Sequence, residues 1–184
     1  RFVPEMEVMG ARLIFSAYPD VVGLLANDPE AKKIEMSPLA LSDIDFQARL
    51  LDLPLYLGVK TPSDVPKRIP YLFAKPAKAA EWCDFFAADK GLKVGLVWAG
   101  NPAHGSDAFR SASINIFAPL IGIPDVTFYG LQKGAGIKEA KIPPEGLAYQ
   151  WIGDLFSNFD DTAAAIANLD LVICVDTSVA HLAA

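Results

Sequence analysis

The stretch LKVGLVWAG, residues 92–100, is an almost continuous apolar run that leads directly into the polar loop NPAHGSDAFRS, residues 101–111. An apolar run of this length is typical of a parallel strand that is covered on both faces. Sheets built from such strands bind ligands beyond the carboxyl ends of the strands. The run therefore predicts a strand inside an α/β sheet, with the polar loop at its ligand-binding end.

Three more apolar runs downstream have the character of strands, and helical segments lie between them. The predicted strands are VTFYGLQ (126–132), LAYQWIG (147–153) and LVICVD (171–176). The predicted helices cover residues 116–121 and 160–170, and Asp160 or Asp161 together with Thr162 is expected to cap the second. Strands that alternate with helices indicate a doubly wound parallel sheet.

The first part of the chain is less regular. GARLIFSA (10–17) and AKKIEM (31–36) are predicted strands, and PDVVGLLAND (19–28) is a predicted helix. A Pro-rich stretch over residues 51–76 then excludes long regular elements and suits a connector. We expect two partial domains, residues 1–77 and 78–184.

A helix is predicted over residues 78–91, at the start of the second domain. Ala80, Trp82, Phe85 and Phe86 follow helical spacing within it. Gly91 is the expected C-cap of this helix.

Composition limits the class of protein. The chain has 184 residues, of which 52% are hydrophobic, and a formal net charge of -6, which argues against a nucleic-acid partner. Its two cysteines, Cys83 and Cys174, offer no disulfide framework, and no apolar run has the roughly 18 residues of a membrane helix. We expect a cytoplasmic protein. Because the chain starts at Arg1 and stops inside a helical pattern, we also expect it to be a piece of a longer protein.

The loop after the first strand of the second domain carries several chemically active side chains. His104, Asp107, Arg110 and Ser111 bring an imidazole, a carboxylate, a guanidinium and a hydroxyl within a few residues. Arginine is well suited to bidentate binding of a phosphate. Alternatively, Asp107 and Arg110 only pair with each other in a solvated loop. His104 and Asp107 alone are too few for a metal site, so no metal is expected.

Two further junctions follow predicted strands. In VDTSVAHLAA (175–184), Asp176 closes a predicted buried strand, and Thr177 and Ser178 can cap the helix that follows. The unpaired backbone N–H groups at the positive end of this helix indicate an anion site, and His181 can share a helical face with Thr177 and Ser178. Ordinary caps and a core histidine are the alternative. In GLQKGAG (130–136), Gln132 and Lys133 could contact a sugar or phosphate, or form a simple turn. The motifs GxGxxG, GxxxxGK[ST] and GxSxG are all absent.

Together these segments resemble a known family. The chain resembles the glycosyltransferase domain that follows tetratricopeptide repeats in many bacterial proteins. The resemblance lies in the segments VGLVWAGNPAHGSDAFRS, FYGLQKGAG and DLFSNFDDTAAAIANLDLVICVDTSVAHLAA. That domain is similar to the heptosyltransferases of glycosyltransferase family 9. RFVPEMEVMGARLIFSAYPDVVGLL resembles, more loosely, the second strand and helix of the family's N-terminal domain.

The resemblance implies a GT-B architecture, in which two Rossmann-like domains face a cleft and the C-terminal one holds a nucleotide-sugar donor without a metal. The expected activity is transfer of the sugar to an unknown glycan, lipid or protein acceptor; the nucleotide-sugar is a substrate, so no cofactor is expected. Carried over by position, the expected donor-binding residues are Asn101, Arg110, Ser111, Gln132, Lys133, Asp176, Thr177, Ser178 and His181.

The catalytic base is expected upstream of Arg1, with His104 and Asp107 as weaker candidates. Two rival hypotheses remain open. One is a noncatalytic GT-B-like scaffold or interaction module beside tetratricopeptide repeats. The other is a dinucleotide-dependent Rossmann enzyme, which the absent fingerprint disfavours.

Overall fold

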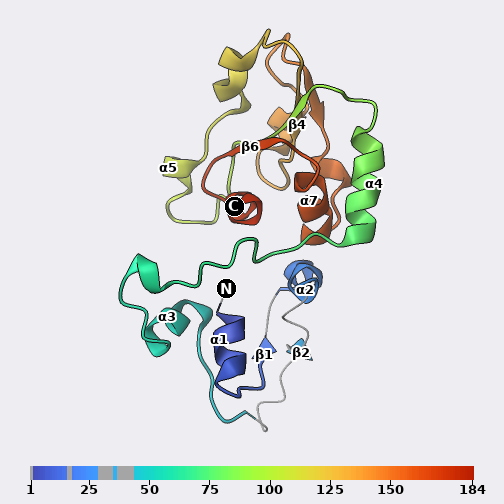
Figure 1. Ribbon diagram of the computed structural model, residues 1–184. Coiled ribbons are helices and arrows are strands. Elements are labelled where there is room, and N and C mark those ends of the chain that lie inside the picture. Colours follow the sequence, from blue (N-terminus) through green and yellow to red (C-terminus); the bar gives the residue numbers. More distant parts are fainter. Residues whose placement is uncertain (1, 16–17, 29–34, 37–43) are drawn as a thin grey trace. The chain divides into compact units, whose positions relative to one another are not determined.

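In a computed structural model the chain forms two compact units, Arg1–Phe73 and Ala74–Ala184. The structure describes residues 2–15, 18–28, 35–36 and 44–184 (Figure 1). The division between the units falls just before the helix α4 (Pro76–Phe86), whereas the boundary expected from the sequence, between residues 77 and 78, falls inside that helix.

The first unit contains a parallel pair of short strands, β1 (Ile14–Phe15) and β2 (Glu35–Met36). The helix α2 (Pro19–Ala26) lies between them in sequence, as predicted, and starts with a proline at its first position, where the missing N–H costs nothing. The strand predicted over residues 10–17 is shorter than expected, since residues 10–13 lie outside β1, whereas both described residues of the strand predicted over 31–36 belong to β2; residues 16–17 and 31–34 lie outside the described part. The other elements among the described residues of this unit are α1 (Val3–Val8), η2 (Leu50–Asp52), α3 (Leu53–Tyr56) and η3 (Pro62–Asp64).

The end of α2 is held to the last residues of the first unit. The guanidinium of Arg68 donates two hydrogen bonds to the Asp28 carboxylate, at 2.9 and 2.6 Å, and lies over the ring of Phe73. Asn27 donates from Nδ2 to the carbonyl of Phe73. The Pro-rich connector is therefore fixed to its own unit despite its lack of long helices.

The second unit is a four-stranded, fully parallel sheet in the order β5-β4-β3-β6. Its first strand in sequence lies beside the second and the fourth, which is the 3-2-1-4 order of a Rossmann-like sheet. All four predicted strands are confirmed, each shorter than its apolar run: β3 (Leu92–Val97), β4 (Val126–Gly130), β5 (Tyr149–Trp151) and β6 (Leu171–Cys174).

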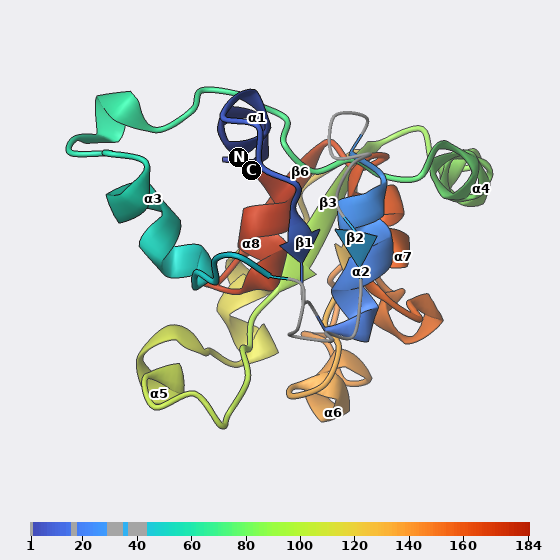
Figure 2. The ribbon, with the colours of Figure 1, turned by 90° about the horizontal axis from the view of Figure 1, so that it is seen from below.

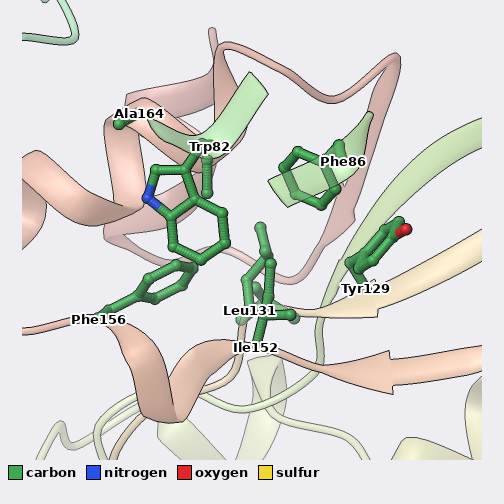
Figure 3. Packing of buried hydrophobic residues seen from close by; sticks show 9 residues of the cluster. Trp82, Phe86, Tyr129, Leu131, Ile152, Phe156 and Ala164 are labelled. Carbon is green, nitrogen blue, oxygen red and sulfur yellow. The ribbon is translucent and has the colours of Figure 1, made fainter. Parts of the chain in front are cut away.

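One face of this sheet is covered by α4 and α7 (Phe159–Ile166), which lie side by side in Figure 1. Between the helices and the strands is an aromatic cluster in which the Trp82 ring contacts Phe86 and Phe156, and Phe86 packs edge-to-face on Tyr129 (Figure 3). Of the helical face predicted for residues 78–91, Trp82 and Phe86 are buried, whereas Phe85 and Ala80 are exposed.

The opposite face is covered by η4 (Ile114–Leu120) and α6 (Ile137–Ala140), so the sheet is doubly wound. Three residues of this second cluster, Val94, Leu96 and Trp98, occupy every second position of β3 and the residue after it, as the pleat of a strand requires. The other buried members come from the elements around the sheet: Ile114, Phe117, Phe128, Ala140 and Leu147. The helix predicted over residues 116–121 is therefore present as a 3₁₀ helix that begins two residues earlier.

An ion pair between α4 and α7 adds to the first cluster. The ammonium of Lys78 bonds to the Asp161 carboxylate, which also accepts the backbone N–H of Ser157 at 2.7 Å. Burial of Asp161 opposes its ionisation, but these hydrogen bonds outweigh burial and hold the pKa of Asp161 below its usual value. The same bond raises the pKa of Lys78.

Of the predicted helix caps, that of α7 is confirmed in part and that of α4 is wrong. The N-cap of α7 is Asn158, whose side chain accepts the backbone N–H groups of Asp160 and Asp161, and Asp161 completes a capping box. Gly91 does not cap α4, because the helix ends at Phe86 and its C-cap is Ala87. Gly91 instead allows close packing, since a Cβ atom there would lie 2.6 Å from the carbonyl oxygen of Asp125.

Candidate functional site

The candidate site lies where the strand order of the second unit reverses. The chain leaves β3 toward β4 on one side, and β6 returns to the other side of β3. Ligands of open α/β sheets bind beyond the carboxyl ends of the strands at such a point. Two loops end there, residues 98–111 after β3 and residues 175–177 after β6. The first of them leaves the arrowhead of β3 and carries α5 (Asp107–Arg110), as seen in Figure 2.

A hydrogen-bond network of side chains and backbone groups joins these two loops. We call it the Arg110 site, and its residues are Gly100, Asp107, Arg110, Ser111 and Asp176. Arg110 donates from Nε to Asp107 Oδ1 at 3.1 Å and from Nη1 to the carbonyl oxygen of Asp176 at 3.1 Å. Ser111 Oγ donates to Asp107 Oδ1 at 2.9 Å and accepts the N–H of Gly100 at 2.8 Å. Four of the expected residues are thus brought together.

The alternative of a loose solvated pair does not describe Asp107 and Arg110, whose side chains are only 15% and 21% exposed. Glycine at position 100 is what lets the guanidinium lie so close to the backbone. A Cβ atom there would lie 2.7 Å from Asp107 Oδ1 and 2.8 Å from Arg110 Nη2. The Arg110 site therefore depends on a residue without a side chain.

Arg110 keeps hydrogen-bonding capacity for a ligand. A guanidinium has five N–H donors, and the bonds found for Arg110 in the described part of the chain are those to Asp107 and to the Asp176 carbonyl. The Asp107 carboxylate compensates part of its charge and fixes its orientation. Such a fixed, partly exposed guanidinium can bind an anionic oxygen without first losing side-chain entropy.

The segment that follows β6, residues 175–184, carries a hydroxyl, a carboxylate and an imidazole. Thr177 is the N-cap residue of α8 (Ser178–Ala183), but its side chain makes no capping bond, contrary to expectation. Its Oγ1 is buried and has no hydrogen-bond partner among the described residues. His181 Nε2 lies 3.9 Å from Asp176 Oδ1, and both side chains are exposed, so His181 is not a core histidine. Ser178 is also exposed.

Gln132 is buried, and its amide is used inside the protein rather than for a ligand. Its Oε1 accepts the N–H groups of Trp98 and Ala99, at 3.1 and 3.0 Å. Its Nε2 donates to the carbonyl oxygens of Ala99 and Ala135, at 3.0 and 2.6 Å. Gln132 was expected to contact a sugar or phosphate. Its amide instead forms hydrogen bonds that join the ends of β3 and β4.

The side chains of three other expected residues bond to groups outside the Arg110 site. Lys133 Nζ bonds to the carbonyl of Phe156, after η5 (Gly153–Leu155). Asn101 Oδ1 accepts the N–H of Ala103 at 3.0 Å and so closes a local turn. His104 is exposed, and its Nδ1 accepts the N–H of Ser106 at 3.2 Å.

Sequence reasoning missed the residues that let these strand ends approach each other. The indole N–H of Trp151 donates to the carbonyl of Gln132 at 3.0 Å. A Cβ atom on Gly153 would lie 2.2 Å from that carbonyl oxygen, and one on Gly136 would lie 2.9 Å from the indole nitrogen of Trp98. The signal available in the sequence was the glycine that ends each of the segments GLQKGAG (130–136) and LAYQWIG (147–153).

Burial, and after it the Asp176 carboxylate, raises the pKa of the Cys174 thiol at the end of β6. Over the described residues no three His, Cys, Asp or Glu side chains are grouped as ligands for a metal ion. No helix in the same part of the chain is long and apolar enough to cross a membrane.

Comparison with known proteins finds a similar protein. The chain is 32% identical over 123 residues to protein FlbA of Caulobacter vibrioides (strain ATCC 19089 / CIP 103742 / CB 15). The match covers 64% of this chain and 21% of FlbA, so the chain spans about a fifth of the length of the curated relative it matches. No protein-family model matches the chain, and no solved structure matches it.

Proposed function

We propose that this chain is part of a GT-B glycosyltransferase, related to family 9 and to the transferase domains that follow tetratricopeptide repeats, whose second unit binds a nucleotide-sugar donor. The observation that carries this proposal is the position of the Arg110 site. It holds a fixed guanidinium at the point of a Rossmann-like sheet where ligands bind, between the loops after β3 and β6.

The chemistry of the site suits a sugar linked through a diphosphate. Arg110 supplies a cation for phosphate oxygens, and the exposed carboxylate of Asp176 is an acceptor for sugar hydroxyls. The buried Thr177 hydroxyl, which has no partner among the described residues, is a donor for a further ligand oxygen. In the transfer step, Arg110 would stabilise the negative charge that develops on the departing diphosphate.

The proton of the acceptor hydroxyl needs a base. Asp107 is not suited to that role, because its carboxylate already accepts bonds from Arg110 and Ser111. We assign Asp107 to the positioning of Arg110. The carbonyl of His104 accepts the N–H of Asp107 at 2.9 Å, but the bond found for its imidazole comes from Ser106, outside the Arg110 site, so we assign the His104 ring no role.

Isothermal titration of the full chain with nucleoside diphosphates tests the proposal. Arg110→Ala is expected to weaken binding about 10- to 100-fold, because hydrogen bonds to charged groups contribute about 1.5–3 kcal/mol. Asp176→Ala is expected to weaken binding of the nucleotide-sugar more than that of the diphosphate. Arg49→Ala is the matched control, since that side chain is 92% exposed and forms a surface ion pair with Asp52.

Unchanged binding in both the Arg110→Ala and Asp176→Ala variants would contradict the site. If the wild-type chain binds no nucleoside diphosphate at all, the noncatalytic scaffold becomes the better hypothesis.

A further inference from the structure

Phe109, next to Arg110 in sequence, has an exposure that the fold does not explain. Its side chain is 93% exposed, more than any other large apolar side chain of the second unit, all of whose residues the structure describes. Phe85, by comparison, is 41% exposed and still contacts the rings of Trp82 and Phe86. A phenylalanine that lies in water gives up the stabilisation that burial would provide.

The ring stands on a fixed support. The N–H of Phe109 bonds to the carbonyl of Ser106 at 3.1 Å, and the N–H of Ser111 bonds to the carbonyl of Asp107 at 2.9 Å. The side chains on both sides of this turn, Asp107 and Arg110, belong to the bond network of the Arg110 site. Phe109 is thus presented to solvent from a turn with defined geometry.

Phe109 also directly precedes Arg110, the residue whose guanidinium we propose for the phosphates. Consecutive Cα atoms lie about 3.8 Å apart, and consecutive side chains of a helical turn diverge by about 100°. A ligand whose diphosphate contacts Arg110 can therefore place the group attached to that diphosphate against Phe109. Every nucleobase has a planar π-face that stacks on an aromatic ring.

We propose that Phe109 stacks on the nucleobase of the donor and so forms part of the nucleoside subsite. This inference rests on the proposed function, because it requires a nucleotide whose diphosphate is bound by Arg110. It goes beyond that function by naming which side chain contacts the base. Stacking alone discriminates weakly between bases, so Phe109 contributes affinity more than base selectivity.

The test compares two probes on the full chain: inorganic pyrophosphate, which has no base, and a panel of ADP, GDP, CDP and UDP. Phe109→Ala is expected to weaken the best nucleoside diphosphate about tenfold and to leave pyrophosphate binding unchanged. Arg110→Ala is expected to weaken both probes. Phe109→Tyr, which keeps the aromatic face, is the conservative control and should bind like the wild type.

The outcomes separate the two proposals. If the wild type binds the nucleoside diphosphate and Phe109→Ala binds it equally well, the stacking inference is overturned while the proposed function stands. If Phe109→Ala weakens both probes alike, the side chain supports the loop rather than the base, which also overturns the inference. If the wild type binds neither probe, the proposed function fails and the inference fails with it.

A second readout does not depend on affinity. The variant Phe109→Trp puts an exposed indole at this position, and stacking of a base on it should quench its fluorescence. The wild type, with its own Trp82, Trp98 and Trp151, supplies the baseline. Quenching by the nucleoside diphosphate but not by pyrophosphate is the expected result; equal signals with both probes would contradict it.

Discussion

Two tyrosines on neighbouring strands of the parallel sheet differ in how their hydroxyl groups are used. Tyr129 donates to Asp89 Oδ2 at 2.8 Å. The hydroxyl of Tyr149 is buried and has no partner among the described residues. Burial raises the pKa of both phenols, and for Tyr129 the hydrogen bond to Asp89 adds to the rise. Both rings are therefore neutral over the physiological pH range, and only one hydroxyl stabilises the fold.

Removing each hydroxyl should therefore have opposite effects. Tyr129→Phe leaves the Asp89 carboxylate without this donor and is expected to lower the free energy of unfolding by about 1 kcal/mol. Tyr149→Phe removes a desolvated group without breaking a bond, so we expect no loss, or a gain of up to about 1 kcal/mol. Urea unfolding of both variants measures this difference, and each serves as the control for the other. A loss for Tyr149→Phe similar to that for Tyr129→Phe would indicate a buried water bound to the Tyr149 hydroxyl.

Residue identity alone did not reveal which polar side chains face a ligand. Arg110 and Asp107 could be singled out because a guanidinium and a carboxylate lie three residues apart in a loop that follows a strand. Gln132 could not be separated from them, because its use depends on how closely the ends of β3 and β4 approach. That approach is set by glycines at positions 136 and 153, whose contacts are far apart in sequence.

At the level of elements, the amide of Gln132 joins the loops that follow β3 and β4. It is 2% exposed and bonds to backbone groups of both loops. Replacing it should separate these loops rather than unfold the sheet locally. The effect should extend to the Arg110 site, because Ala99 directly precedes Gly100.

Gln132→Ala is expected to lower the free energy of unfolding by about 2–4 kcal/mol, since buried backbone N–H and carbonyl groups lose their partners. Gln132→Glu has the same shape but replaces the donor with an acceptor that faces the carbonyl oxygens of Ala99 and Ala135. We expect Gln132→Glu to be at least as unstable at neutral pH and partly restored at low pH, where the carboxyl group becomes protonated and can donate. Chemical unfolding at two pH values measures this; equal stability of Gln132→Glu and the wild type at neutral pH would contradict the assigned bonds.

The elements of the second unit could be predicted because their apolar patterns are strong. Within the run over residues 92–100, residues 94–98 are buried, and the three later runs form the other strands of the same sheet. Helix ends were less predictable, since Asn158 is the N-cap of α7 while Asp161 bonds back to it in a capping box, and only the backbone geometry shows which residue has which role. The strand order, and with it the position of the Arg110 site, required the pairing of strands distant in sequence.

At the scale of the whole molecule, the two units have unequal cores. Both hydrophobic clusters lie entirely within residues 74–184. In the described part of the first unit, Leu24 is the one buried apolar side chain of the core. Stability is therefore concentrated in the sheet that carries the candidate site, while the described residues of the first unit contribute little apolar burial of their own.

Residues 74–184 expressed alone should fold, because a chain of this size with two covered sheet faces buries enough apolar surface to offset its conformational entropy. We expect a cooperative thermal transition, native-like circular dichroism and amide protection concentrated in β3 and β4, which are the two inner strands. Residues 1–73 alone, as the matched control, should show neither cooperativity nor protection. If residues 74–184 were unfolded in isolation while the full chain folded, the sheet would depend on the first unit.

The nucleotide titrations should also give similar affinities for residues 74–184 and for the full chain, because every residue of the Arg110 site belongs to the second unit.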